Sequence, residues 1–305
     1  MPVPRAILAA ALACLLPHQG AAEPADRLVF AAWNVRNYLL RPVKNDEGRI
    51  MTPAKTPESI AAVLTTLKQI RPDILGLCEI GSKTDLADLQ RRLHKVGIDL
   101  PHKTWVDGPD RERHLALLSR FPLRAEHDTE STFRLEGVSQ RVRRGILDVT
   151  AEVRPDFRLR ILGVHLKSNR VVPEYDQAAF RRAESLILRS HVEKILGEDP
   201  DTPLLVFGDF NDTKNSPVVK GVAGRPGTGQ SLAILSLADR LGDQWTYRWE
   251  ESDEYFRIDY IMVSPSLRPL VARGGTRLHR DKKWFEASDH RPMIVTLRLP
   301  TVAAR

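Results

Sequence analysis

Short apolar runs that end in an acid, an amide or an imidazole recur along this chain, and they constrain its fold more than any other feature. The run over residues 28–33 ends at Asn34, and the run over residues 74–78 ends at Glu79. Apolar runs of this length are typical of buried strands. The sequence therefore predicts buried strands, each of which delivers a polar side chain at its C-terminal end.

Two helices are expected between and after these strands. Thr56 and Pro57 form a helix start, and apolar residues follow at helical spacing until Pro72 ends the pattern. A second helix is expected over residues 175–196. Further strands are expected over residues 115–118, 145–153, 159–166, 204–207, 258–263 and 293–299.

The balance of these elements predicts the fold class. Strands outnumber helices, and the runs at 145–153 and 159–166 are spaced like the two arms of a hairpin. An α/β chain of this kind is expected to form two largely antiparallel sheets packed face to face, with helices outside. Three loops, at 36–56, 211–230 and 276–288, are expected to be long, and long loops in a compact domain are often functional.

Residues 1–22 have the features of a secretory signal peptide. Arg5 precedes an apolar run over residues 6–16, and small residues over 20–22 follow that run. The run is far shorter than the roughly 20 residues that a transmembrane helix needs. We therefore expect cleavage at the end of this segment, a secreted or periplasmic mature chain without an integral membrane segment, and a single domain over residues 23–305.

The two cysteines leave an alternative for the leader and set a limit for the mature chain. Cys14 lies within the apolar run, behind Leu12 and Ala13, so processing as a lipoprotein stays an alternative. After cleavage only Cys78 remains, and an internal disulfide is then impossible. We expect a monomer whose core is sufficient by itself.

The charge is mildly basic. The chain has 46 basic and 39 acidic residues, a formal net charge of +7, and loss of the leader removes only the charge of Arg5. Arg134, Arg141, Arg143 and Arg144 precede an apolar strand pattern, which suits an anionic substrate or a membrane phosphate. A solvated arginine-rich face is the equal alternative. Arg144 is therefore a candidate for substrate binding and no more.

The polar residues at the strand ends have the chemistry that hydrolysis of a phosphate ester requires. The reaction needs charge neutralisation on the phosphoryl oxygens, an oriented water and an acid for the leaving group. Carboxylates with amides provide hard oxygen ligands, which suit Mg²⁺, Mn²⁺ or Ca²⁺ better than zinc. One such residue alone is usually only a loop start, but the set comprises Asn34, Glu79, His165, Asp209, Asn211, Asp259, Asp289 and His290.

Six short motifs occur in the order of a known superfamily. They are Trp33-Asn34-Val35, Cys78-Glu79-Ile80, Gly163-Val164-His165-Leu166, Gly208-Asp209-Phe210-Asn211, Ile258-Asp259-Tyr260 and Ser288-Asp289-His290-Arg291-Pro292. Over residues 28–299 the chain resembles the endonuclease/exonuclease/phosphatase superfamily, as a secreted bacterial-type member. The resemblance implies a deoxyribonuclease I-like, four-layer α/β/β/α sandwich and a metal-dependent hydrolase of phosphate esters.

The resemblance also implies a role for most strand-end residues. Glu79 would be the main ligand of one or two divalent ions, Mg²⁺ or else Mn²⁺ or Ca²⁺, and Asn34 and Asp289 would complete the site. Asp209 would align or deprotonate the attacking water. Asn211 would donate a hydrogen bond to a phosphate oxygen.

By the same resemblance, the two histidines act on the phosphoryl group. His290, oriented by Asp259, would serve as a base or as a phosphoryl-binding cation, and His165 would stabilise the phosphate or protonate the leaving oxygen. The structural alternatives are a strand cap for Asp259 and a hydrogen-bonded core histidine for His165. Lys167 and Asn169 are either substrate-binding residues or solvated loop residues.

The motif around His165 narrows the substrate class. Histidine followed by leucine at this place resembles the diesterase, sphingomyelinase and 5-phosphatase branches, whereas exonuclease III-like enzymes carry a tyrosine. We therefore expect an extracytoplasmic phosphodiesterase or nuclease. A phospholipid-headgroup or phosphomonoester hydrolase is the second hypothesis, and a non-catalytic binding module on the same fold is the third.

One further motif has the spacing of a phosphate-binding P-loop without its chemistry. The segment 224–231 has the glycines of such a loop, but Gln230 stands where a lysine is required, and no strand pattern precedes the segment. The sequence predicts a flexible loop rich in glycine and proline there.

Overall fold

Two six-stranded sheets form the centre of the protein, which the computed structural model describes over residues 26–281 and 283–300. The first sheet contains, in spatial order, β17 (Val271–Leu278), β18 (Met293–Arg298), β1 (Arg27–Tyr38), β4 (Ile74–Ile80), β6 (His114–Ser119) and β5 (His102–Trp105). The second contains β13 (Ala233–Ile234), β16 (Asp259–Val263), β12 (Leu204–Asp209), β11 (Phe157–His165), β10 (Leu147–Arg154) and β7 (Leu123–Ala125). Neighbouring strands run antiparallel except β1 with β4 and β11 with β12, so the expected largely antiparallel sheets are confirmed.

The two sheets pack face to face through an apolar core. Phe30 of β1 meets Phe207 of β12 edge to face, with the ring centroids 5.4 Å apart, and both side chains are fully buried. Gly76 and Gly163 make room for the Phe207 ring, because a Cβ would lie 2.4 Å from this ring at Gly76 and 2.7 Å from it at Gly163. Each buried side chain of this size stabilises the fold by roughly 1.5–3 kcal/mol.

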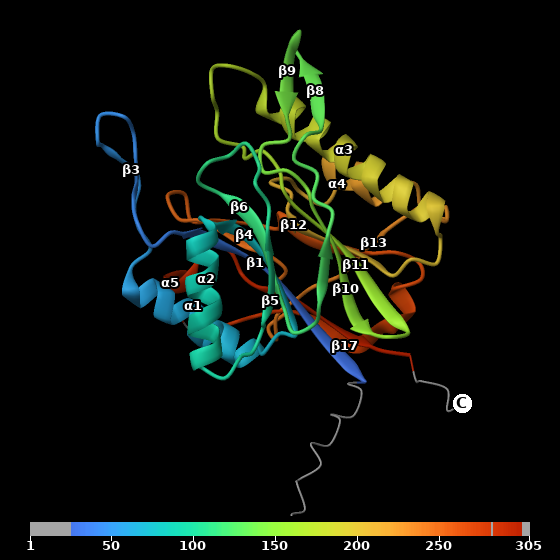
Figure 1. Cartoon of the computed structure of the whole chain (residues 1–305). Helices are drawn as coiled ribbons and strands as arrows, with labels where there is room; N and C mark the ends of the chain where they lie inside the picture. Colours follow the sequence, from blue (N-terminus) through green and yellow to red (C-terminus); the bar gives the residue numbers. More distant parts are fainter. Residues whose placement is uncertain (1–25, 282, 301–305) are drawn as a thin grey trace, which may run out of the picture.

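Helices cover the outer faces of both sheets (Figure 1). α1 (Pro57–Ile70) and α2 (Lys83–Lys95) pack on the first sheet, whereas α3 (Gln177–Glu198) and α4 (Pro217–Ala223) pack on the second. Each helix pair shares an apolar cluster with the sheet beneath it. The protein is therefore a four-layer α/β/β/α sandwich, as the resemblance implies.

The two expected helices are present, and α2 is an additional one. α1 begins at the predicted start, where the Thr56 side chain accepts a hydrogen bond from the backbone N–H of Ser59. α3 is shifted slightly towards the C-terminus from the predicted range 175–196. α2 begins with a capping box formed by Ser82 and Asp85, a helix-start signal that the sequence carries but that did not enter the prediction.

The segments expected to be long loops are partly regular, so that prediction is wrong in detail. Residues 36–56 contain a hairpin of β2 (Val43–Lys44) and β3 (Ile50–Thr52), residues 211–230 contain α4, and residues 276–288 contain the end of β17 and α5 (Trp284–Ala287). Two more hairpins were not expected: β8 (Thr132–Leu135) with β9 (Val138–Arg141), and β14 (Tyr247–Trp249) with β15 (Glu254–Phe256). Elements this short show no measurable hydrophobic period.

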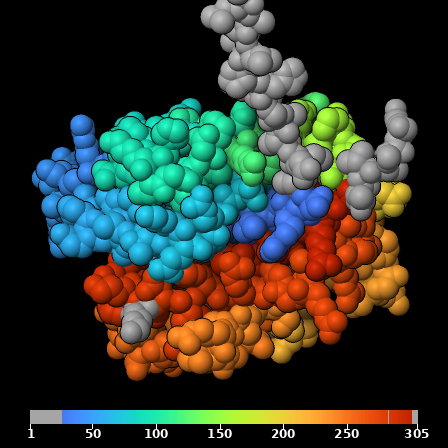
Figure 2. Space-filling view, turned by 90° about the horizontal axis from the view of Figure 1, so that it is seen from below, coloured from blue at the N-terminus to red at the C-terminus, as the bar shows by residue number. Residues whose placement is uncertain are grey.

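The two ends of the described chain lie together. Arg27 at the start of β1 pairs with Arg298 at the end of β18, and the two segments lie side by side in the view from below (Figure 2). The predicted signal peptide, residues 1–22 with Cys14, lies outside the described residues. Within the described ranges, no helix is long and apolar enough to cross a bilayer.

Candidate active site

Strand register brings several of the predicted site residues together. His165 of β11, Asp209 of β12 and Asp259 of β16 occupy one row across the second sheet. Side chains in one row point to the same face of a sheet. Asn34 of β1 reaches this row from the first sheet, because its Nδ2 donates to Asp209 Oδ2 over 3.1 Å. The candidate site therefore lies where the two sheets meet.

Glu79 is turned into the site by an irregularity in β4. The register of β4 against β1 and β6 shifts around this residue, and its φ of 63° lies in the left-handed region. Bulges re-aim side chains, and a positive φ in a residue other than glycine is strained. Glu79 Oε1 accepts a hydrogen bond from Asn34 Nδ2 over 3.1 Å, and Oε2 accepts one from the backbone N–H of Asn37 over 3.0 Å. The carboxylate is thereby fixed while 16% of its side chain stays exposed.

The expected contact between Asp259 and His290 is confirmed. His290 Nδ1 lies 2.8 Å from Asp259 Oδ2, and both residues are buried. The Tyr247 ring covers the imidazole, with centroids 4.7 Å apart. Burial opposes the charged form of His290, but the negative charges of Asp259 and Asp209 outweigh it and raise the pKa of His290 to about 10. These charges favour the imidazolium, which fits the phosphoryl-binding cation better than the free base.

Asp209 is the centre of the network. Its Oδ1 accepts a hydrogen bond from the backbone N–H of Asn211 over 2.9 Å, and its Oδ2 lies 3.5 Å from His165 Nε2 and 3.7 Å from His290 Nε2. Burial raises the pKa of Asp209 to about 7, and the negative charge of Asp259 acts in the same direction. A carboxyl group with this pKa exchanges protons readily near neutral pH.

His165 is a buried, neutral imidazole. Burial lowers its pKa well below the ordinary value, and the positive charges of Arg144 and His290 lower it further. Its Nδ1 has no hydrogen-bond partner among the described residues. Burial, and after it the charges of the surrounding cations, therefore oppose an imidazolium at this position in the protein alone.

Asn211 has one amide hydrogen left for a substrate. Its Nδ2 donates to the backbone oxygen of Leu166 over 3.0 Å, and an amide nitrogen carries two hydrogens. Its φ of 51° places it in the left-handed region, which asparagine tolerates better than most residues. The turn that follows β12 therefore presents the side chain beside Asp209.

The three proposed substrate-binding residues are partly engaged within the protein. Lys167 Nζ donates to oxygens of its own loop, and Asn169 Nδ2 donates to the backbone oxygen of Asn211 over 3.2 Å. Arg144 Nε lies 2.9 Å from Asp110 Oδ2. Arg144 Nη1 is buried and has no hydrogen-bond partner within the described ranges.

Two arginines that the sequence analysis missed flank the acidic groups. Arg36 Nε lies 3.7 Å from Asp289 Oδ2, and Arg113 Nε lies 3.9 Å from Glu79 Oε2. Both arginines stand in irregular or loop segments, where no period predicts the direction of a side chain. They add positive charge beside the carboxylates on which a divalent ion would depend.

Two sets of residues offer oxygen or nitrogen atoms to a metal ion. Asp209, Asp259 and His290 have ligand atoms within 4.8 Å of one another. Within this set, the charges of Asp259 and Asp209 raise the pKa of His290 to about 10, which opposes the neutral form that a metal ligand requires. Its ring is also held by Asp259. We therefore regard this set as a hydrogen-bonded network in the first place.

By residue chemistry, Glu79, Asn34 and Asp289 suit a hard divalent ion better. They offer carboxylate and amide oxygens, which are the ligands of Mg²⁺, Mn²⁺ and Ca²⁺. The side chains of Glu79 and Asp289 are 16% and 26% exposed, so an ion can reach them from solvent.

The sandwich and this network of acids, amides and two imidazoles define a hydrolase of phosphate esters. The profile of the Endonuclease/Exonuclease/phosphatase family matches residues 31–290, and the chain belongs to this family. Enzymes of the family depend on divalent metal ions. Membership of this family of hydrolases favours an enzyme over a non-catalytic binding module.

Solved structures with this fold cover nearly the whole chain, although no curated protein sequence matches it. Beta toxin from Staphylococcus aureus is 14% identical with a TM-score of 0.60, over 88% of this chain and 99% of that chain. TDP2 from D. rerio, solved with a single-strand DNA product, is 16% identical with a TM-score of 0.60, over 89% and 99%. ANGEL2, described as a 2′,3′-cyclic phosphatase, is 13% identical with a TM-score of 0.59, over 90% and 96%.

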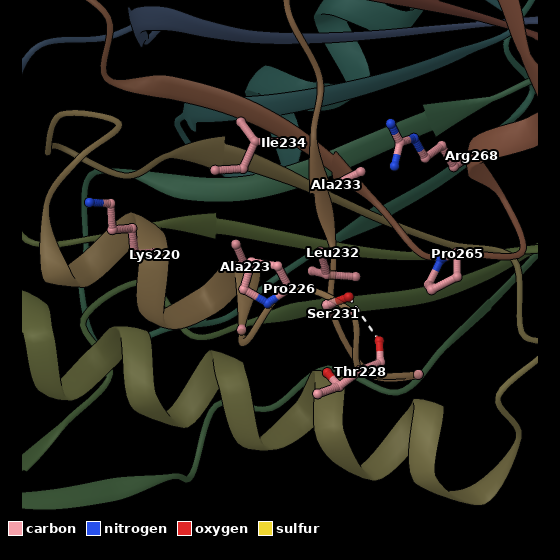
Figure 3. A pocket seen from close by; sticks show the side chains of 13 residues that line it. Lys220, Ala223, Pro226, Thr228, Ser231, Leu232, Ala233, Ile234, Pro265 and Arg268 are labelled. Carbon is pink, nitrogen blue, oxygen red and sulfur yellow. Dashed lines mark hydrogen bonds between the residues drawn. The ribbon is translucent and has the colours of Figure 1, made fainter.

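The glycine-rich segment 224–231 lies apart from this site. It follows α4 and precedes β13, whereas a P-loop follows a strand and precedes a helix, so rejection of the P-loop is confirmed. The segment lines a surface groove of about 830 Å³ with Lys220 and Arg268 (Figure 3). None of the candidate catalytic residues lines this groove.

Proposed function

We propose that this protein is an extracytoplasmic phosphodiesterase that acts on nucleic acid with Mg²⁺ as its metal ion. The observation that carries the proposal is the pair of imidazoles beside Asp209, with His165 Nε2 3.5 Å and His290 Nε2 3.7 Å from Oδ2. One imidazole is neutral and the other is charged. A phosphodiester bound there would meet a base, a cation and a group for the leaving oxygen.

Glu79, Asn34 and Asp289 would hold the metal ion. When bound, the ion supplies positive charge that neutralises the phosphoryl oxygens. Mn²⁺ and Ca²⁺ are alternatives, because they take the same oxygen ligands.

The attack depends on three residues around the phosphoryl group. Asp209 orients the water and takes its proton, since a pKa of about 7 suits a general base at neutral pH. His290, fixed by Asp259, remains charged and stabilises the phosphoryl oxygens. Asn211 donates its second amide hydrogen to one of these oxygens.

His165 acts on the leaving oxygen. A bound phosphodiester carries a negative charge, which offsets the nearby charges of Arg144 and His290 and raises the pKa of the imidazole. The ring then takes up a proton from solvent, delivers it to the departing alkoxide and returns to the neutral form, while Asp209 releases to solvent the proton that it took from the attacking water. An unactivated diester needs this help because an alkoxide is a poor leaving group.

Location and substrate are proposed from different observations. The leader at residues 1–22 favours a secreted or periplasmic, bacterial-type enzyme, which would not reach cytoplasmic DNA for repair. The single-strand DNA product in D. rerio TDP2 supports nucleic acid. The name of ANGEL2 as a 2′,3′-cyclic phosphatase supports a small phosphate ester, and a phospholipid headgroup remains the other alternative.

A turnover screen tests the proposal. The purified mature chain is offered plasmid DNA, RNA, sphingomyelin, a phosphomonoester and bis-nitrophenyl phosphate, each with and without Mg²⁺ or Mn²⁺. We expect metal-dependent cleavage of nucleic acid above that of any other substrate. The Asp209→Asn variant serves as the control for contaminating nucleases. Faster turnover of sphingomyelin or of a monoester than of any nucleic acid would overturn the substrate assignment.

A further inference from the structure

Glu184 of α3 is a buried carboxylate that the proposed reaction does not use. It is only 1% exposed, and a carboxylate buried to this depth destabilises the fold unless hydrogen bonds compensate it. No ion pair to it occurs within the described ranges, where its partners are two backbone N–H groups. Oε1 accepts from Arg143 over 2.9 Å, and Oε2 accepts from Lys167 over 2.7 Å.

Both backbone groups belong to segments that carry site residues. Lys167 follows His165 by two positions, and Arg143 precedes Arg144, whose charge lowers the pKa of His165. A single side chain of the outer helix layer therefore joins the segment that carries Arg144 to the segment that carries His165. Burial raises the pKa of Glu184, whereas the N–H of Arg143, the charge of Arg144 and the N–H of Lys167 lower it.

Arg181, nearly one turn earlier in α3, holds the other side of the same peptide. Its Nη1 donates to the backbone oxygen of Lys167 over 3.0 Å, and its Nε lies 3.2 Å from Asp212 Oδ2. Residues three positions apart lie on one face of a helix. Both backbone polar groups of Lys167 are thus bound to side chains of α3, and Asp212 next to Asn211 is bound as well.

The segment held in this way is connected to the reacting groups. The backbone N–H of Leu166 donates to the backbone oxygen of Asp209 over 2.9 Å, and the backbone oxygen of Leu166 accepts from Asn211 Nδ2 over 3.0 Å. A shift of residues 166–167 would therefore displace His165 and Asn211 together. A displacement of about 1 Å in a catalytic group can lower a rate by about 100-fold.

From these contacts we infer that Glu184 and Arg181 are positioning residues, which form a clamp from α3 on the turn after β11 and thereby set the place of the His165 imidazole. The inference rests on the proposed function, because it assigns His165 to the leaving oxygen. Neither residue touches the reacting atoms. Their effect on catalysis must pass through His165 and, to a smaller extent, through Asn211.

Glu184→Gln is the central variant. An amide has one oxygen to accept a hydrogen bond, so its NH₂ group must face one of the two backbone N–H groups. The variant should lower kcat by about 100-fold on an unactivated dinucleotide diester with little change in KM. The loss on bis-nitrophenyl phosphate should be much smaller, because nitrophenolate leaves without a proton. Glu193→Gln, a change at an exposed position on the same helix, is the matched control and should leave kcat on both substrates unchanged.

The His165→Ala background separates positioning from a general loss of structure. If the clamp acts through His165, adding Glu184→Gln to His165→Ala should cause little further loss, since coupled residues are not additive. An unchanged kcat for Glu184→Gln, or a full additional 100-fold loss in the His165→Ala background, overturns the inference. If Glu184→Gln does not fold, Arg181→Lys takes its place with the same expected dependence on the leaving group.

Hydrogen exchange distinguishes failure of the clamp from failure of the proposed function. The amide protons of Lys167 and Arg143 should exchange slowly in the wild type and in Glu193→Gln, and much faster in Glu184→Gln. If the wild type cleaves no phosphodiester, the proposed function has failed, but hydrogen exchange still tests whether Glu184 holds the two segments. Unaltered exchange of both amides in Glu184→Gln overturns the inference of a clamp.

Discussion

Asn34 Nδ2 donates to Asp209 Oδ2 over 3.1 Å, and this contact crosses from the first sheet to the second. The two residues are separated by 175 positions in the chain. The proposed metal ligands Asn34 and Glu79 therefore stand on the first sheet and the proposed base stands on the second. The site is therefore complete only when the two sheets have packed against each other.

Removal of the metal ion should abolish activity. We expect EDTA to stop turnover and Glu79→Gln to lower kcat/KM by at least about 100-fold, because a charge that stabilises the transition state is lost. The measurement is activity as a function of Mg²⁺ concentration. The Mg²⁺ concentration that gives half-maximal activity should be higher in Glu79→Gln than in the wild type. Glu250→Gln, an exposed carboxylate near Arg36, is the control. Full activity in EDTA would show that the reaction does not depend on a metal ion.

Loss of the Asp259 carboxylate should weaken catalysis and change its pH dependence. Asp259→Asn should keep the fold and lower the rate by roughly 10- to 10⁴-fold. Because the charge of Asp259 raises the pKa of His290 to about 10, its removal should move the basic limb of the pH–rate profile to lower pH. Asp253→Asn, an exposed change in a neighbouring turn, is the control. A profile with an unmoved basic limb contradicts the charged role of His290.

His165 should make the enzyme depend on the leaving group. His165→Ala should slow an unactivated diester severely and bis-nitrophenyl phosphate much less, because only an alkoxide needs a proton as it departs. Rates on the two substrates are compared at saturating Mg²⁺. Equal losses would remove the general-acid role and leave His165 as a phosphate-binding residue.

The buried pair of Asp239 and Arg291 should control stability in acid. Both side chains are fully buried, with Arg291 Nη2 2.8 Å from Asp239 Oδ2. Burial alone would raise the pKa of Asp239, but hydrogen bonds from Arg280, from the Leu241 N–H and from Arg291 hold it well below the usual range. The pair therefore stabilises the fold fully above the unfolded-state pKa of about 4, and this contribution is lost as the pH falls further.

Asp239→Asn tests that pair. The variant should lower the free energy of unfolding at pH 7 by about 3–5 kcal/mol, since it leaves a buried guanidinium without its partner. The difference from the wild type should shrink as the pH falls below about 4. Asp243→Asn, which removes an ion pair whose side chains are 33% and 43% exposed, should cost less than about 1 kcal/mol. Urea titrations at several pH values provide the measurement.

Export should leave a shortened chain. We expect the mature protein to begin near Glu23, because small residues at 20–22 follow the apolar run of the leader. Intact-mass measurement of protein recovered from outside the cytoplasm gives the N-terminus. A product that still begins at Met1 contradicts the prediction, and a lipid on Cys14 would favour the lipoprotein alternative.

The sequence by itself determined the long apolar strands at the centre of both sheets, the layers and the identity of most site residues, but not β5, β7, β13 and β17. Runs such as 28–33 and 204–207 are buried in the structure as predicted. A strand with apolar side chains on both faces is stable only where both faces are covered. The polar residues lie at several places in these strands: His165 and Asp209 end β11 and β12, Asp259 begins β16, and β1 continues to Tyr38 beyond Asn34. Local pattern was sufficient for these features.

Only the tertiary structure decided how these residues act on one another. The left-handed turn of Glu79, the arginines at 36 and 113 and the clamp of Glu184 depend on contacts between segments far apart in the chain. The two imidazoles differ for the same reason: Asp259 and Asp209 raise the pKa of His290 to about 10, whereas burial, and after it the charges of Arg144 and His290, lower the pKa of His165 well below its ordinary value. A pKa is set by burial and neighbouring charges, and both exist only after the two sheets have packed.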